Sequence, residues 1–207
     1  MKLGPDFDQE KLKYLDNTTL HSRDLDLTPF HLDYIDDDYM RWMHDDTVIK
    51  HTRLYSYDRT YKGLIAYAER VINTPGSYFW SVVHRLDNKR IGTAKLVIDL
   101  EHGIANWGYL IGEKDYWRDS AAIQAQVSLI DFAFFTAGVR KVHGSTYSDH
   151  IKSRFNLARM EFSKEGVLRS HFRRGDKGAE IVDLVSYGML KEEWQKVSSK
   201  FDNLKYG

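Results

Sequence analysis

The spacing of apolar residues changes near the middle of the chain, and this change constrains the fold more than any other feature. In residues 78–85, 91–100 and 104–111 the spacing follows a period of two, and short polar turns separate the three segments. This period is typical of half-buried strands, so we expect three antiparallel neighbours. Residues 121–137 instead carry apolar side chains at helical spacing, and Gly138 is well placed to end that helix. A strand meander followed by a helix therefore forms the predicted centre of the fold.

The flanking segments extend this centre to an α+β (mixed α/β) fold. We expect a strand over 19–29, helices over 30–43 and 58–72, a strand over 139–146, a helix over 149–160, and a terminal hairpin of 162–172 and 181–190 followed by a polar helix. A strand, helix and strand in succession form a crossover, so 104–111 and 139–146 should be parallel neighbours. We predict a lead-in over 1–18, one domain over 19–194 with a mixed, mostly antiparallel twisted sheet and helices on both faces, and a polar tail over 195–207.

The composition excludes several kinds of site and partner. The chain has 207 residues, no cysteine and zero formal net charge. Disulfides, thiolate nucleophiles and thiolate metal sites are therefore ruled out, and no overall field recruits nucleic acid or an anionic membrane. The nine histidines show no metal-ligand spacing, so we predict no metal site. We see no leader and no apolar run long enough for a membrane span, and we expect a cytoplasmic protein.

Several short sequences occur in an order that resembles a known family. They are Ile91-Gly92-Thr93, Gly108-Tyr109-Leu110-Ile111-Gly112, Tyr116-Trp117, Phe132-Ala133-Phe134, and Phe162 with Glu165-Gly166. In this order they resemble the GNAT superfamily of acetyl-CoA-dependent N-acetyltransferases, in particular the branch of ribosomal-protein N-terminal and amino-sugar acetyltransferases. The resemblance covers roughly residues 19–194 and implies an acyltransferase that uses acetyl-CoA as co-substrate.

The resemblance implies where acetyl-CoA binds. In the family, the strand that matches 104–111 splays from its parallel neighbour, and its main chain bonds the pantetheine arm; here Leu110 and Ile111 would supply those groups. The pyrophosphate is held at the N-terminus of the next helix, where amides are unpaired and the helix dipole favours negative charge. The residues expected to bind it are Arg118, Ser120, Ala121 and Ala122.

Asp119 departs from the family pattern. The family usually has glycines in this turn, and here Arg118 and Ser120 stand at the glycine positions with Asp119 between them. Its carboxylate either repels the pyrophosphate or caps the helix and occupies the amides that the ligand needs. Ala158 and Glu161 also replace the family's usual glutamate and glycine. These changes support a second hypothesis, a catalytically degenerate binding or assembly module with weak or no acetyl-CoA binding.

The resemblance also implies candidate catalytic residues. The family branch has an Asn-x-x-Ser pattern at the start of the helix that matches 149–160, and the serine is its proposed acid. This chain keeps Ser153, has His150 in place of the asparagine, and offers Tyr147 as a weaker second acid. For removal of the amine proton we expect a water chain rather than a histidine. His143 lies on a predicted core strand, and we expect it to be buried.

Aromatic and basic residues occur together on the expected acceptor side. In the fold that the resemblance implies, the acceptor pocket includes the loop over 47–57 and residues 171–174. Such side chains either hold an anionic or sugar-nucleotide substrate or form an ordinary surface. We predict acetyl transfer to a primary amine of a small molecule, and slightly favour an amino sugar over a protein N-terminus. We expect no specific nucleic-acid or membrane partner, and leave a homodimer open.

Overall fold

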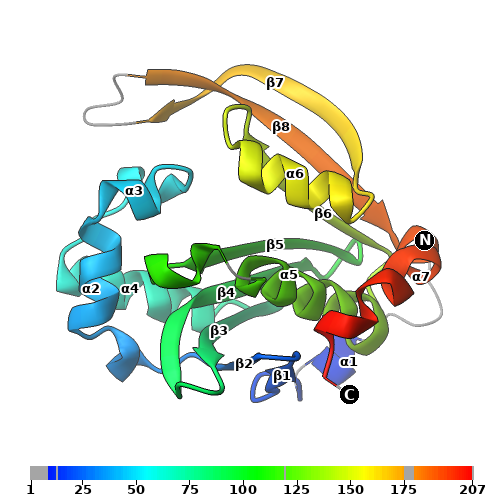
Figure 1. Cartoon of the computed structure of the whole chain (residues 1–207), viewed down its shortest axis with the longest axis horizontal. Helices are drawn as coiled ribbons and strands as arrows, with labels where there is room; N and C mark the ends of the chain where they lie inside the picture. Colours follow the sequence, from blue (N-terminus) through cyan, green and yellow to red (C-terminus); the bar gives the residue numbers. More distant parts are fainter. Residues whose placement is uncertain (1–8, 13, 119, 175–179, 207) are drawn as a thin grey trace.

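Eight strands form one sheet in the computed structural model, which describes residues 9–12, 14–118, 120–174 and 180–206. Their order is β1-β2-β3-β4-β5-β6-β8-β7 (Figure 1). The strands are β1 (Leu20–His21), β2 (Leu25–Pro29), β3 (Ser77–His84), β4 (Lys89–Asp99), β5 (Ile104–Ile111), β6 (Lys141–Tyr147), β7 (Ser163–Arg174) and β8 (Glu180–Leu190). All neighbours are antiparallel except β5 and β6. The predicted fold class, with its single parallel pair, is confirmed.

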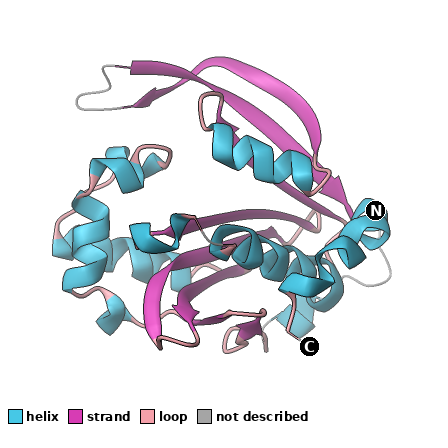
Figure 2. Ribbon diagram, in the orientation of Figure 1, coloured by secondary structure: helices cyan, strands magenta, loops and turns pink. Residues whose placement is uncertain are grey.

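Helices cover both faces of this sheet (Figure 2). They are α1 (Gln9–Leu12), α2 (Asp37–His44), α3 (Asp46–Ile49), α4 (Tyr61–Ile72), α5 (Ala121–Asp131), α6 (Ile151–Arg159) and α7 (Lys191–Val197), with short turns η1 (Leu32–Tyr34), η2 (Arg53–Ser56), η3 (Lys114–Trp117), η4 (Phe132–Thr136) and η6 (Ser198–Leu204). Tyr78 and Trp80 of β3 pack in the cluster around α5, whereas Phe79 between them packs with α2 and α4. Because side chains alternate along a strand, α5 and α4 lie on opposite faces. No helix among the described residues is long and apolar enough to cross a membrane.

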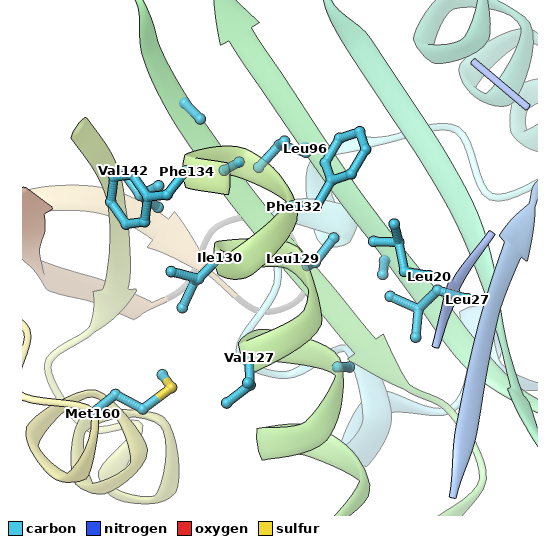
Figure 3. Packing of buried hydrophobic residues seen from close by; sticks show 14 of the residues in the cluster. Leu20, Leu27, Leu96, Val127, Leu129, Ile130, Phe132, Phe134, Val142 and Met160 are labelled. Atoms are coloured by element: carbon cyan, nitrogen blue, oxygen red, sulfur yellow. The ribbon is translucent and has the colours of Figure 1, made fainter. Parts of the chain in front are cut away.

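Helix α5 lies in the interior. Apart from Ala122, every residue from Ala121 to Ile130 is buried, as expected for a helix that packs on several sides. Figure 3 shows Leu129 beside Leu20 and Leu27 of the first strands. Gly138 ends the helical segment with a φ of 74°, a left-handed conformation that suits glycine. Packing on several sides therefore fixes α5 against the sheet.

Local hydrogen bonds move three element boundaries away from the predicted ones. The strand expected over 19–29 is two strands, because Ser22 turns the chain and its amide bonds the Leu25 carbonyl at 2.9 Å. The helix expected over 30–43 begins only at Asp37, because the Asp36 carboxylate accepts from the Tyr39 amide and caps it. Polar side chains near an expected start therefore decided where each element begins.

The helix expected to begin at Asp58 begins instead at Tyr61. Thr60 is its N-cap, and its hydroxyl accepts from the Gly63 amide at 3.2 Å. The Asp58 carboxylate accepts from the Thr60 amide at 2.9 Å. Asp58 therefore holds the capping residue in place but does not itself cap the helix.

Strand β7 forms one edge of the sheet. Its register with β8 shifts between Lys164 and Gly166 and again between Leu168 and Phe172. At the second shift Ser170 has a φ of 50°, and its amide bonds the Asp183 carboxylate at 2.8 Å. These bulges interrupt the ladder along the open edge.

The terminal segments contribute to the core. Leu12, within the expected lead-in, is buried, and its carbonyl accepts from the Tyr78 hydroxyl at 3.0 Å. The segment expected as a polar tail continues as η6, which buries Phe201 and Leu204. The Phe201 ring stacks on Trp194 with centroids 5.7 Å apart. The segment after residue 194 is therefore packed structure through Leu204, because two apolar side chains at close spacing anchor it.

We expect Phe201→Ala to lower the free energy of unfolding by about 3 kcal/mol, because it removes a ring that is 3% exposed. Urea denaturation followed by circular dichroism measures the change. Leu86→Ala is the control, since Leu86 is 86% exposed and should change stability by less than about 0.5 kcal/mol. Equal effects of the two substitutions would show that the last residues do not belong to the folded unit.

Candidate functional site

The parallel strands β5 and β6 pair over only a short length. Residues 104–106 of β5 align with residues 141–143 of β6, and no further pair follows, although β5 runs to Ile111 and β6 to Tyr147. Figure 1 shows the two strands diverging toward these carboxyl ends. Beyond the paired residues, the main chain of β5 has no ladder partner on that side among the described residues.

The register with β4 decides which main-chain groups of β5 face this opening. Leu110 pairs with Thr93, and its carbonyl oxygen lies so close to Gly92 of β4 that a Cβ there would collide with it. Because antiparallel residues alternate between ladder-bonded and outward-facing main chain, Tyr109 and Ile111 face the opening instead. The expectation for Leu110 therefore does not hold for its carbonyl. Ile111 stays a prediction, and Tyr109 joins it.

Two aromatic side chains of β5 occupy the part of the opening nearest the paired residues. Trp107 and Tyr109 stack with centroids 6.0 Å apart, and Trp107 also meets Phe162 edge-on. A Cβ on Gly144 of β6 would lie 3.4 Å from the Trp107 ring, so the ring packs against β6 at this residue. Burial raises the pKa of Tyr109 to about 12, although a hydrogen bond with Asn156 acts to lower it. These rings fill the narrow end and leave the wider end for a ligand.

Trp117 connects the two sides of the opening at that wider end. Its indole N–H donates to the Ile111 carbonyl at 2.8 Å, and the Lys152 ammonium of α6 lies 5.8 Å from its ring centroid. The Ile111 carbonyl keeps a second lone pair for another donor.

The Ser120 side chain does not cap the start of α5. Ser120 is the N-cap residue, but no side chain in the described part of the chain caps the helix there. The Ser120 hydroxyl instead accepts from Arg23 at 3.1 Å and from Gln124 at 2.7 Å. Ala121 and Ala122 follow with small side chains. Unpaired amides at a helix start attract anions, which is the chemistry expected of this turn.

Arg118 and Asp119 are the other two residues of the turn. Arg118 has helical backbone angles and an exposed side chain. Asp119, on which the doubt about this turn depended, lies outside the described residues.

The candidate acids lie near the start of α6. Ser153 is only 8% exposed, and the described residues give its hydroxyl no hydrogen-bond partner. The Tyr147 hydroxyl donates to the Thr52 carbonyl at 3.1 Å, and burial raises the pKa of Tyr147. His150 stacks on His51 with centroids 4.1 Å apart, and burial followed by the His51 charge lowers the pKa of His150 to about 4. Of the two hydroxyl candidates, Tyr147 already donates its proton to a carbonyl, whereas the described residues offer the Ser153 proton no acceptor.

The loop over 47–57 and the terminal hairpin, expected to form the acceptor side, do meet in space. The Arg53 guanidinium lies 4.7 Å over the Phe172 ring. Arg174 is buried and donates to Asp149 at 2.7 Å and to Glu180 at 2.8 Å. The contacts that join the loop to the hairpin are between residues far apart in the chain, such as Arg53 and Phe172, so the sequence pattern alone could not place them. The expectation for His143 is wrong: its side chain is exposed, on the strand face opposite Val142.

A cavity of about 280 Å³ lies at the start of α5, near the β1–β2 turn. It is lined by Arg23, Asp24, Leu25, His84, Tyr116, Ser120, Ala121 and Gln124. It borders β2 and β3 rather than the opening between β5 and β6. Among the described residues, no group of three or more His, Asp or Glu side chains could hold a metal ion.

Residues 24–163 match the family model of the acetyltransferase (GNAT) domain. This chain belongs to the GNAT acetyltransferase family. It is 28% identical over 116 residues to the N-acetyltransferase p20 of Bacillus licheniformis, named as uncharacterized, and the match covers 56% of this chain and 63% of p20. The match to YoaA of Bacillus subtilis covers 52% of that relative. The matched part thus spans less than two thirds of either relative.

Solved structures share most of the fold of this GNAT chain. A GCN5-related N-acetyltransferase from Brucella melitensis has a TM-score of 0.72 at 19% identity, covering 89% of this chain and 84% of that one. Mutant forms of the spermidine/spermine N-acetyltransferase SpeG from Vibrio cholerae have a TM-score of 0.70 at 14% identity, covering 84% of this chain and 97% of that one. At these identities the likeness shows the fold alone. The specific branch within the superfamily stays a prediction.

A buried carboxylate fixes the end of β5 in this GNAT chain. Glu113 accepts from the Trp42 indole at 2.7 Å, from Lys89 at 2.9 Å and from Arg41. Burial alone would raise the pKa of Glu113, but the hydrogen bonds from these three donors outweigh it and lower the pKa to about 2. The carboxylate thereby ties α2 and the start of β4 to the residue just before η3. No sequence motif marked it, because its partners are distant in the chain.

We expect Glu113→Gln to lower the free energy of unfolding by roughly 3 kcal/mol at pH 6. A carboxylate with a depressed pKa stabilises the fold at pH values above the pKa that it has in the unfolded chain. That stabilisation disappears as pH falls from 4.5 toward 2, so the difference between wild type and variant should shrink over this window. Urea denaturation at several pH values measures it. The exposed Glu101→Gln is the control. A difference that does not vary with pH would contradict the role of the charge.

Proposed function

We propose that this protein transfers an acetyl group from acetyl-CoA to a primary amine of a small molecule. The observation that carries the proposal is the early end of β5–β6 pairing next to a helix start that the Ser120 side chain does not cap. Together they offer main-chain hydrogen bonds for an amide-containing arm and free amides for a pyrophosphate. The alternative, a catalytically degenerate binding module, is not favoured, because the strand opening and the helix start occur together in this chain.

The residues present fit acetyl-CoA in the following way. The main chain of Tyr109 and Ile111 binds the pantetheine arm, and the amides of Ser120, Ala121 and Ala122 bind the pyrophosphate. Arg118 is exposed at this turn and pairs with a phosphate oxygen. Bound acetyl-CoA supplies the acetyl group as a reactive thioester.

Proton transfer completes the proposed reaction. A bond forms between the amine nitrogen and the acetyl carbonyl carbon, and the carbon–sulfur bond breaks. Ser153 gives its proton to the departing sulfur, and water takes the proton from the attacking amine and restores the serine. Tyr147 is a weaker candidate for the acid, because its hydroxyl already donates to a carbonyl. His150 is held neutral by burial, with a pKa lowered to about 4, and serves to position the start of α6.

For the acceptor we favour an amino sugar over a protein N-terminus. Arg53 over Phe172, with the stacked His51 and His150 nearby, offers aromatic and cationic surfaces that suit a polar ring. SpeG acts on spermidine and spermine by its name. A polyamine needs carboxylates in the pocket, and those of Asp149 and Glu180 are paired with Arg174 here.

The direct test is thiol release from acetyl-CoA in the presence of glucosamine, followed with a thiol-reactive dye. We expect release that depends on the amine, together with a product heavier by one acetyl group in mass spectrometry. Saturating calorimetric titration with acetyl-CoA is the companion measurement. An absence of both heat and thiol release, across a panel of primary amines, would sink the proposal.

We expect Ser153→Ala to reduce kcat by about 100-fold, the usual contribution of a general acid, without a comparable rise in the KM for acetyl-CoA. Steady-state thiol release measures both constants. Ser199→Ala, an exposed serine in η6, is the matched control and should leave kcat unchanged. Full activity of Ser153→Ala would show that the proton comes from another group.

A further inference from the structure

Two cations beside the sheet share one tyrosine. The Lys95 ammonium of β4 lies 3.2 Å from the Tyr67 hydroxyl and 5.6 Å from its ring centroid, and the Arg70 guanidinium of α4 lies 5.7 Å from the same centroid. No ion pair joins either cation to a carboxylate within the part of the chain that the structure describes. Both cations lie near the same ring, so an anion bound beside Tyr67 would be attracted by both.

Neighbouring rings hold the Tyr67 side chain in place. The Tyr67 ring meets the buried Phe79 ring edge-on, with centroids 6.2 Å apart. Tyr57, at the end of the loop over 47–57, lies 5.4 Å from Tyr67, and Arg70 lies 5.8 Å over the Tyr57 ring. Two rings thus form a fixed platform that the cations border, and ligand binding need not order it.

The platform lies next to open space above β5. Lys95 is the direct partner of Gly108 in the β4–β5 ladder, so the two residues share one sheet face. A Cβ on Gly108 would have no atom within 4 Å. Gly108 also precedes Tyr109, whose main chain faces the opening between β5 and β6. A group bound at Lys95 therefore lies about one strand spacing, roughly 5 Å, from the strand proposed to hold the acetyl donor.

We propose that Lys95, Arg70 and Tyr67 form a subsite for an anionic group, phosphate or carboxylate, carried by the acceptor amine. The proposal rests on the proposed acetyl transfer and narrows its acceptor to small amines that are also acids. Lysine and arginine donate charge-assisted hydrogen bonds to such a group, and the Tyr67 hydroxyl adds a neutral one. The same cations repel a polyamine. Glycine at 108 leaves the space in which the body of the acceptor lies.

The test compares matched amines. We expect kcat/KM for glucosamine 6-phosphate to exceed that for glucosamine by roughly 10-fold or more, because one charge-assisted hydrogen bond provides such a factor. Alternatively, kcat/KM for an amino acid should exceed that for its carboxamide by a similar factor. A preference within only one pair identifies the anion as phosphate or as carboxylate. Lys95→Gln and Arg70→Gln should each remove most of the preference and leave the KM for acetyl-CoA unchanged. Lys62→Gln, an exposed cation on the same helix as Arg70, should preserve it.

A binding measurement separates failure of this inference from failure of the proposed function. Glucosamine 6-phosphate and the amino acid are titrated into the full chain and followed by tyrosine fluorescence, with no acetyl-CoA present. Saturable binding by wild type that is lost in Lys95→Gln supports the subsite even if no amine is acetylated. Acetylation that shows no preference for the anionic amine in either pair overturns the subsite. An equal loss of binding in Lys62→Gln and Lys95→Gln also overturns it. Binding of neither anionic probe also overturns it.

Discussion

The short pairing of β5 with β6 is the constraint on which the rest of the site depends. Three aligned residues hold the strands together, and beyond Asn106 and His143 they separate. An unpaired main chain is costly unless it finds partners, and on β5 the Trp117 indole supplies one such partner, at the Ile111 carbonyl. If β5 and β6 paired along their whole length, no room would remain for the pantetheine arm. The divergence therefore creates the binding capacity at the expense of sheet continuity.

The parts around this divergence are held by contacts between distant segments. Glu113 fixes the end of β5 to α2 and β4, and so sets where η3 and the start of α5 lie. Arg174 fixes the hairpin to the residue that precedes His150. The starts of α6 and α5 thus each have a buried ionic anchor of their own. Rigid support of this kind keeps reacting groups in register without a ligand.

The sequence predicted much of this arrangement, for identifiable reasons. The three central strands and α5 were found because their apolar spacing persists over many residues, and the parallel pair followed from the crossover rule. Boundaries failed where one polar side chain decides them, as at Ser22, Asp36 and Thr60. The direction of the Leu110 carbonyl could not be predicted, because it depends on the ladder register with β4. The partners of Glu113 and Lys95 could not be found, since both depend on side chains that meet only after folding.

The bulged β7 edge has a consequence for the behaviour of the protein at high concentration. An uninterrupted outer strand presents a straight row of unsatisfied amides and carbonyls, which templates stacking of further chains into fibrils. The shifts at Lys164 and Leu168 break that row into short stretches. Charged side chains such as Lys164 and Arg169 stand exposed along it. The sheet can therefore end at an open edge without inviting amyloid growth.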